Sequence, residues 1–196
     1  FYVSSGDGFQ PRVDPSDQNI IYGQSQDGNI TKRNRITGES KSIRPSAQNT
    51  TDTNGGGAYR FHWDTPLQWA QADSNVLLVG GNKLFVSKDR GDSWTAISPD
   101  LTDNRDREGE MIMGVKNSDV RIAKNDGIAS WPALTAVSDS PKMAGVYYTG
   151  SDDGIVAATK DGGKTWDKTL ANRMPGFVKG GFVSRIQASR YDAGTV

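Results

Sequence analysis

The octet SKDRGDSW occupies residues 87–94, and a close copy of it, TKDGGKTW, occupies residues 159–166. Both copies have the form Ser/Thr-x-Asp-x-Gly-x-x-Trp. In this pattern the aspartate side chain can accept hydrogen bonds from backbone amides of its own turn, the hydroxyl can add another, and the glycine can adopt a positive φ. A turn that is stapled in this way is an architectural device. The two octets therefore predict a repeated structural unit and not a duplicated active site.

Eight residues carry this structural expectation, and in each octet the tryptophan is expected to fold over its own hairpin. They are Ser87, Asp89, Gly91 and Trp94 in the first octet and Thr159, Asp161, Gly163 and Trp166 in the second.

The repeat extends well beyond the octets. NVLLVGGNKLFVSKDRGDSW (75–94) aligns with GVYYTGSDDGIVAATKDGGKTW (145–166), and NIIYGQSQDGNITKRNRITGES (19–40) is an earlier copy without the octet. A fourth copy begins at FVSRIQASRYDAGTV (182–196). Short β-rich runs at regular intervals, separated by turn residues, predict four-stranded antiparallel meanders.

Four-stranded units repeated in this way are typical of β-propeller blades. The sequence predicts an all-β fold in which residues 1–196 form a partial propeller of three blades plus one inner strand. The expected blades are about 8–45, 60–102 and 131–172, with an incomplete one at 181–196, and polar loops at about 44–60 and 99–130 separate them. Because three blades leave open edges, we expect the remainder of the propeller to come from further sequence or from other chains.

Composition excludes several classes of function. The chain has 23 Lys and Arg against 23 Asp and Glu, whereas a nucleic-acid-binding protein usually carries a basic excess. It has no cysteine and a single histidine, His62, so neither thiol chemistry nor a histidine-rich zinc site is available. No apolar run is long enough to span a membrane. We expect no cofactor and no metal.

The repeats and the phrases between them resemble the BNR, or Asp-box, β-propellers of large exported bacterial proteins, which are described as sortilin-like or glycosyl-hydrolase-like. The stretches that carry this resemblance cover nearly the whole chain. They are SSGDGFQPRVDPSDQNIIYGQSQDG (4–28), TGESKSIRP (37–45), YRFHWDTPL (59–67), LFVSKDRGDSWTAISPDLT (84–102), GSDDGIVAATKDGGKTW (150–166) and FVSRIQASRYDAGTV (182–196).

The resemblance implies a seven-bladed propeller, export from the cytoplasm and a larger parent protein. Xyloglucanases and sialidases are more distantly similar. In the xyloglucanase pattern a catalytic aspartate follows the second strand of a blade. Here Gln26 stands at that position in the first blade, with Asp27 next to it, while Asp152 holds the register in the third blade.

A glycosidase needs two carboxyl groups across a cleft, and the expected inner strands and their turns offer several. The catalytic candidates are Asp152, Asp64 and Asp27, with Asp7 and Asp153 as further carboxylates; the ligand-binding candidates are Arg60, His62, Trp63, Trp131 and Arg185. Two alternatives stay open. Asp-Gly pairs are also ordinary turn signals, and the alternating Arg60, His62 and Asp64 suit either a structural network or a ligand-binding floor.

The sequence thus favours an exported, glycosyl-hydrolase-like propeller that acts on or binds polysaccharide. The alternative is a non-catalytic, sortilin-like propeller that binds a protein or peptide, or a structural subunit of a cell-surface assembly.

Overall fold

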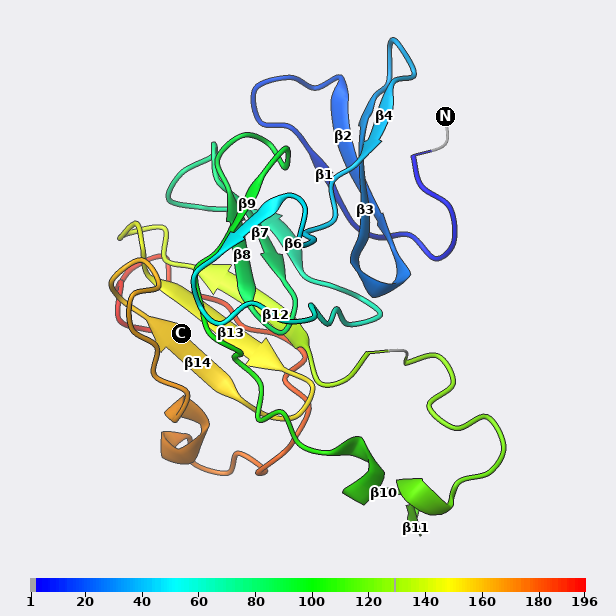
Figure 1. Cartoon of the computed structure of the whole chain (residues 1–196). Coiled ribbons are helices and arrows are strands. Elements are labelled where there is room, and N and C mark those ends of the chain that lie inside the picture. Colours follow the sequence, from blue (N-terminus) through cyan, green and yellow to red (C-terminus); the bar gives the residue numbers. More distant parts are fainter. Residues whose placement is uncertain (1–2, 129) are drawn as a thin grey trace.

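The computed structural model describes residues 3–128 and 130–196, and these form an all-β molecule (Figure 1). Helical structure in the described chain is limited to short 3-10 turns: η1 (Gln26–Gly28), η2 (Arg107–Gly109), η3 (Asn117–Asp119) and η4 (Leu170–Arg173). None of its helices has the length and apolar character needed to cross a membrane.

The first sheet is the four-stranded antiparallel meander expected for residues 8–45. It consists of β1 (Phe9–Val13), β2 (Ile20–Ser25), β3 (Asn29–Asn34) and β4 (Ser40–Ser42), paired in chain order. Gln24 faces Ile30 across the β2–β3 ladder, next to the Ser25–Asn29 pair that closes the turn.

The second sheet has one strand more than the sequence predicts. Its meander is β6 (Leu67–Trp69), β7 (Leu77–Gly80), β8 (Leu84–Ser87) and β9 (Trp94–Ala96). The additional strand, β5 (Thr50–Asp52), comes from the expected loop 44–60 and pairs in parallel with β9 at the sheet edge.

The third sheet has one strand fewer. It is formed by β12 (Leu134–Asp139), β13 (Tyr147–Ser151) and β14 (Val156–Thr159). The expected fourth strand is reduced to a single antiparallel bridge between Ala158 and Asp167. η4 follows almost at once, so the chain turns away before a ladder can form.

The inner strand expected within 181–196 is not formed as a strand. The segment lies along the third sheet, where Val183 and Ala188 are buried and donate to Ser151 and Ser138. It has no neighbouring strand in the described chain with which to build a ladder.

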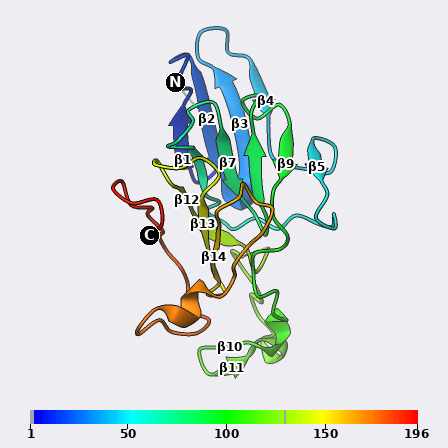
Figure 2. The ribbon, with the colours of Figure 1, turned by 90° about the vertical axis from the view of Figure 1, so that its left-hand side faces the viewer.

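The three sheets stack face to face, with one apolar cluster in each gap (Figures 1 and 2). Alternation along β7 shows this arrangement, because Leu77 and Val79 face the first sheet while Leu78 faces the third. A third, smaller cluster joins the far face of the third sheet to Ala188 and Ile186. The second sheet is therefore buried on both faces.

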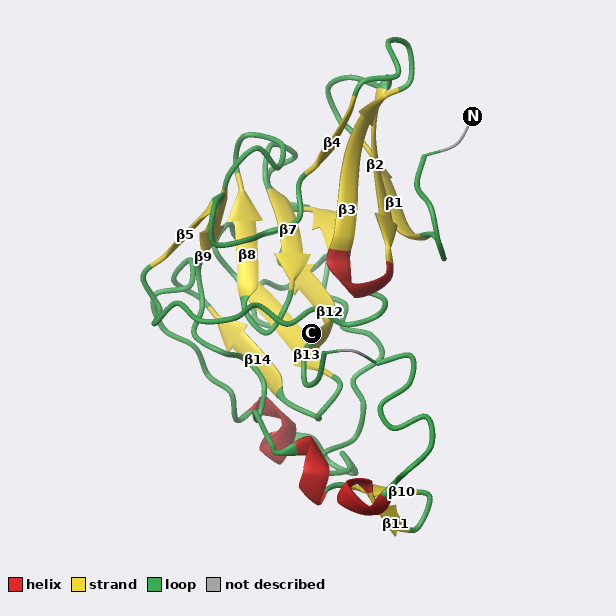
Figure 3. Ribbon diagram, turned by 45° about the vertical axis from the view of Figure 1, so that its right-hand side comes forward, coloured by secondary structure: helices red, strands yellow, loops and turns green. Residues whose placement is uncertain are grey.

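The expected loop 99–130 leaves the body of the molecule and carries a small hairpin, β10 (Met111–Ile112) with β11 (Val115–Lys116) (Figure 3). Arg105 and Glu110 form an ion pair of 2.9 Å at its base. Its tip is apolar and open to solvent, since Met113 is fully exposed.

Candidate functional site

The two octets have the same internal hydrogen bonds. Ser87 Oγ donates to Asp89 Oδ1 at 2.8 Å and accepts from the Gly91 amide at 2.7 Å. Thr159 does the same toward Asp161 and Gly163, at 2.8 and 3.1 Å. Each aspartate also accepts from the backbone amide of the residue immediately before the tryptophan, Ser93 in one copy and Thr165 in the other, both at 2.9 Å. The two glycines have positive φ, as the pattern requires.

Hydrogen bonds to the ionised form control the titration of these aspartates. For Asp161 the bonds from Thr165 are the main cause that holds its pKa below the ordinary value. For Asp89 burial acts in the opposite direction, but the bonds from Ser93 and Ser87 outweigh it and the pKa is again lowered. Both carboxylates are therefore ionised parts of a turn and poor candidates for acid catalysis.

The octet tryptophans do more than cover their own hairpins, because each one reaches the preceding sheet. Trp94 Nε1 donates to the Ile43 carbonyl at 2.8 Å, just beyond the last strand of the first sheet. Trp166 Nε1 donates to the Ile97 carbonyl at 3.1 Å, just beyond the last strand of the second. Gly91 and Gly163 lie against the same two isoleucines. The octets thus connect neighbouring sheets, a role that the sequence does not reveal.

A second link between sheets starts from the first octet. Arg90 Nη1 lies 3.1 Å from Asp14 Oδ2, which also accepts from the Tyr22 hydroxyl at 3.1 Å. The Arg90 guanidinium also stacks over Trp69. Burial acts to raise the pKa of Asp14, but bonds from Ser16 and Tyr22 and the charge of Arg90 leave it lowered. This buried carboxylate is a structural ion.

The predicted catalytic and ligand-binding residues lie mainly near one end of the stack, where the β2–β3 and β13–β14 turns lie. The Asp27 amide donates to the Trp63 carbonyl at 3.3 Å, and the His62 ring meets Phe182 edge-on at 5.7 Å. The β2–β3 turn, the segment before the second sheet and the C-terminal segment therefore share this end of the molecule.

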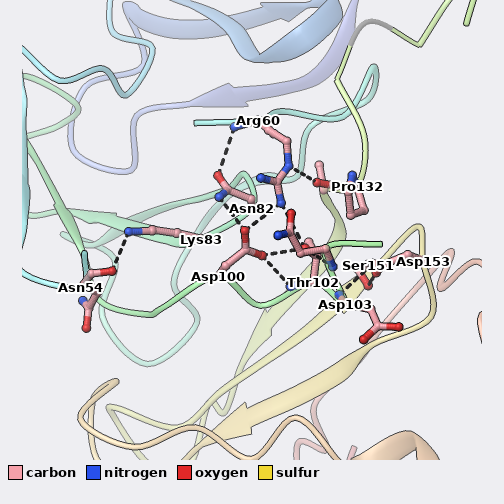
Figure 4. A network of polar contacts seen from close by, with 12 residues as sticks. Asn54, Arg60, Asn82, Lys83, Asp100, Thr102, Asp103, Pro132, Ser151 and Asp153 are labelled. Atoms are coloured by element: carbon pink, nitrogen blue, oxygen red, sulfur yellow. Dashed lines mark hydrogen bonds and ion pairs between the residues drawn. The ribbon is translucent and has the colours of Figure 1, made fainter. Parts of the chain in front are cut away.

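Arg60 is committed to a structural network at this end (Figure 4). Its guanidinium lies 2.7 Å from Asp100 Oδ2 and donates to the Pro132 carbonyl at 2.8 Å. Asn82 Nδ2 donates to the same Asp100 oxygen at 3.0 Å. The network connects the second sheet to the chain that enters the third, so of the two alternatives for Arg60 the structure favours the structural one.

Two of the carboxylate candidates also have structural partners. Asp64 accepts from Gln10 Nε2 at 3.2 Å. Asp153 is buried, and it accepts from the Ser151 hydroxyl and from the Asp103 amide at 2.7 Å. Asp153 thereby anchors the start of the 99–130 segment.

Asp27 and Asp7 lie near the end of the first sheet. Asp27 is half-buried, has a positive φ, and its Oδ1 is buried without a partner in the described chain. Asp7 is exposed and accepts from Gln26 Nε2 at 3.1 Å. Gln26 thus acts here as a hydrogen-bond donor to Asp7.

Asp152 differs from the other candidates. Its Oδ1 accepts from the Ala133 amide at 3.0 Å, while its Oδ2 is buried with no partner among the described residues. Burial is the main cause that raises the pKa of Asp152 to about 7, and the neighbouring Asp153 adds to it. Arg107 acts weakly in the opposite direction. The carboxyl group can therefore hold a proton near neutral pH.

The remaining ligand candidates lie around this end. Trp63 and Trp131 are half-buried, and the Arg105 guanidinium lies 5.5 Å from the Trp131 ring centre. Arg185 is exposed. No hydrogen bond or ion pair joins Asp152 to Asp64 or Asp27 within residues 3–128 and 130–196. Over the same ranges, no three acidic or histidine side chains are grouped so that they could hold a metal ion.

One buried charge pair was missed in the sequence. Lys83 Nζ lies 2.7 Å from Asp52 Oδ2, and it also donates to the carbonyls of Asn54 and Gly56 at 3.0 and 3.1 Å. The Lys83 and Asp52 side chains are only 4% and 6% exposed. Three donors thus meet three acceptors, so the ammonium is satisfied and fixes β5 to the second sheet. A lone lysine in a polar Asn-Lys turn gives no sequence signal for this role.

No protein-family model matches the chain, and no curated protein sequence matches it.

Proposed function

We propose that the chain is part of an exported Asp-box β-propeller that acts on polysaccharide, with Asp152 as its acid. In this proposal each stacked sheet is one blade. Support comes from the repeated meanders, the face-to-face stacking and the two octets that join neighbouring sheets. The proposed ligand-binding face is the end of the stack at which the first strand of each blade begins.

The observation that carries the catalytic part is the state of Asp152. A glycosidase acid must be protonated near the working pH so that it can protonate the leaving oxygen. Asp152 meets this requirement because burial raises its pKa to about 7, and its Oδ2 is free of protein partners in the described chain. Trp131 is placed to stack on a sugar ring two residues before Ala133, which anchors Asp152 Oδ1. Asp27, whose Oδ1 has no partner in the described chain, is the available second carboxylate.

A second candidate function, a non-catalytic propeller that binds glycan or protein, is favoured by one observation. Arg60, Asp64 and Asp153 are all engaged in structural contacts at the same end, so the described chain supplies no paired carboxylates in contact.

Binding and hydrolysis of plant and bacterial oligosaccharides, measured separately, would distinguish the two functions. If the proposal is correct, the chain releases new reducing ends, Asp152→Asn lowers that rate at least about a hundredfold, and Trp131→Ala weakens binding. Arg173→Ala, at an exposed ion pair with Asp167 far along the chain, serves as the control. Binding without hydrolysis would support the second candidate. Absence of both would contradict the polysaccharide proposal.

A further inference from the structure

We propose that a pocket between the second and third sheets binds a guanidinium group on an apolar stem, such as an arginine side chain. The pocket has a volume of about 380 Å³, and Asp139, Tyr147 and Gly162 are among the residues that line it. Tyr147 is the first residue of β13, whereas Asp152 follows its last residue. The pocket therefore lies at the opposite end of the third sheet from the proposed acid and is a separate site.

The first observation is an arginine that fills the equivalent place between the first and second sheets. Arg90, the fourth residue of the first octet, has its Nη1 3.1 Å from Asp14 Oδ2. Its Nη2 donates to Asn75 Oδ1 at 3.3 Å, and its guanidinium carbon lies 5.6 Å from the Trp69 ring centre. In that gap a carboxylate, an amide oxygen and an aromatic ring thus surround one guanidinium.

The second octet and its neighbours are in register with the first. The octet alignment puts Gly162 at the position of Arg90. The turn before the second strand of each sheet fixes the other positions, because in each copy an amide donates to the carbonyl six residues later. These bonds are Asp14–Ile20 (2.9 Å), Ala70–Val76 (2.8 Å) and Ser140–Val146 (3.0 Å).

By this register every partner of Arg90 has a counterpart in the gap between the second and third sheets, and each counterpart is a different residue type. The counterparts are Ala70 for Asp14, Gly145 for Asn75 and Asp139 for Trp69. All three line the pocket together with Gly162. The arginine and two of its partners are therefore replaced by small residues, and a carboxylate stands in place of the indole.

The backbone at Gly162 leaves this space open. Gly162 has a φ of +74°, and a Cβ added there would meet nothing within 4 Å. Arg90 has a φ of 62°, so its backbone lies in the same left-handed region. Gly162 is also exposed, which opens the pocket to solvent. The pocket is thus a place for an arginine side chain that this octet does not supply.

Asp139 gives the pocket an uncompensated charge. Its side chain is buried, and Oδ2 accepts from the Ala72 amide at 2.9 Å. Oδ1 has only a long contact of 3.5 Å to Gln68 Nε2. Within residues 3–128 and 130–196 no cation forms an ion pair with Asp139. A buried carboxylate is costly unless it is paired, so a cationic ligand is favoured here.

The other polar residues of the pocket also suit a cation. Asp73 is a second carboxylate on its lining, while Lys88, which lines it as well, is exposed. Burial raises the pKa of Tyr147, and the charges of Asp139 and Asp73 raise it further. The Tyr147 hydroxyl therefore lies in a region of negative potential, where a bound cation is stabilised.

The remaining walls are apolar and provide a surface for the stem, chiefly through Val76, Val86 and Ile97. A guanidinium is planar, weakly hydrated and always charged, and it carries five N–H donors in a fixed arrangement. It can therefore bind the free side of the Asp139 carboxylate and stack on the Tyr147 ring. A neutral ligand of the same shape cannot compensate Asp139.

Two small probes test the site in the intact chain at constant ionic strength. N-ethylguanidinium and ethylurea have similar shapes but differ in charge, and NMR follows the amides of Gly145 and Gly162. We expect saturable shifts with a Kd in about the millimolar range for N-ethylguanidinium and at least about tenfold weaker binding of ethylurea. No saturation by about 100 mM, or equal binding of the two probes, would overturn the proposal.

Three variants place the binding in the pocket. Gly162→Arg supplies the side chain that Arg90 supplies in the first octet, and it should weaken N-ethylguanidinium binding at least about tenfold without lowering the melting temperature. Gly162→Ala keeps the pocket open and should bind within about twofold of the parent, so it is the matched control. Asp139→Asn keeps an oxygen for the Ala72 amide but removes the charge, and it should also weaken binding about tenfold. Equal binding by all three variants would overturn the proposal.

A third probe, an acetylated and amidated glycyl-arginyl-glycine peptide, distinguishes two sources of the guanidinium. Binding at least about tenfold tighter than that of N-ethylguanidinium would assign the pocket to an arginine of a protein. Equal or weaker binding would assign it to a small guanidinium compound. Neither result depends on whether the chain hydrolyses polysaccharide, because the pocket and Asp152 lie at opposite ends of the third sheet.

Discussion

At the scale of single residues, most candidate side chains are engaged in architecture. Asp89 and Asp161 bind their own turns, Arg60 binds Asp100, and Asp153 binds the Asp103 amide. Their types and spacing could be read from the sequence, but their partners could not. Asp100 and Asp103 lie 40 and 50 residues from Arg60 and Asp153 along the chain. Only the tertiary structure shows that these residues have structural partners, whereas Asp152 Oδ2 has none in the described chain.

The hydroxyl of the octet gives the first prediction. Ser87 is almost completely buried and accepts from the Gly91 amide. Ser87→Ala leaves that amide unsatisfied and should lower the free energy of unfolding by about 1–3 kcal/mol. Ser87→Thr installs the residue found at the equivalent position 159 and should change it little. Urea unfolding of the three proteins measures both effects, and equal losses from Ala and Thr would refute the role of the hydroxyl.

Asp152 gives a prediction about pH. Its pKa is about 7 in the folded chain, above the ordinary value of 3.8, so between these values the folded state binds more protons than the unfolded state. The contribution of Asp152 to stability is therefore fully present below about pH 4 and is lost as pH rises toward 7. Asp152→Asn keeps an oxygen for the Ala133 amide and cannot ionise. We expect the variant to be more stable than the parent at pH 8 and similar to it at pH 4, by urea unfolding. A difference that does not vary with pH would contradict the assignment.

At the scale of elements, the meanders could be predicted because alternating apolar residues and turn residues are local signals. The first sheet and strands β6 to β9 follow the sequence closely. β5 does not, since Thr50–Asp52 lies in a polar loop and its parallel pairing with β9 depends on residues more than 40 positions away. The fourth strand of the third sheet was also predicted and is only a bridge.

β5 depends on a buried charge, which gives the third prediction. Lys83→Met removes the ammonium and leaves the Asp52 carboxylate buried without its ion partner. We expect a loss of about 3–5 kcal/mol in the free energy of unfolding and faster hydrogen exchange in residues 50–52.

The double variant Lys83→Met with Asp52→Asn is the control for β5, because it removes both charges. It should recover part of the stability, since no buried charge is left unpaired. If the double variant is as unstable as Lys83→Met, side-chain packing and not charge holds β5 in place.

At the scale of the whole molecule, each apolar cluster of the described residues joins one pair of neighbouring layers in the stack. The first cluster joins sheets one and two, the second joins sheets two and three, and the third joins sheet three to the C-terminal segment. Stability in such an arrangement is close to a sum of units and nearest-neighbour interfaces. A substitution at one interface should therefore destabilise mainly the two layers that form that interface.

Two equivalent glycines test this expectation and give the last prediction. Gly80→Ala would press Cβ against Pro66, Leu134 and Val137 in the middle of the stack, whereas Gly150→Ala would press it against Val183 and Ile186 near its end. We expect Gly80→Ala to lower the free energy of unfolding by about 1–3 kcal/mol and to speed hydrogen exchange in both the second and the third sheet. Gly150→Ala should speed exchange only in residues 182–195 and β13, with the first two sheets unchanged. Gly109→Ala, where an added Cβ meets nothing within 4 Å, is the control. If Gly150→Ala loosens the first sheet as much as the third, the molecule unfolds as one cooperative unit and the description as a stack of neighbouring repeats is wrong.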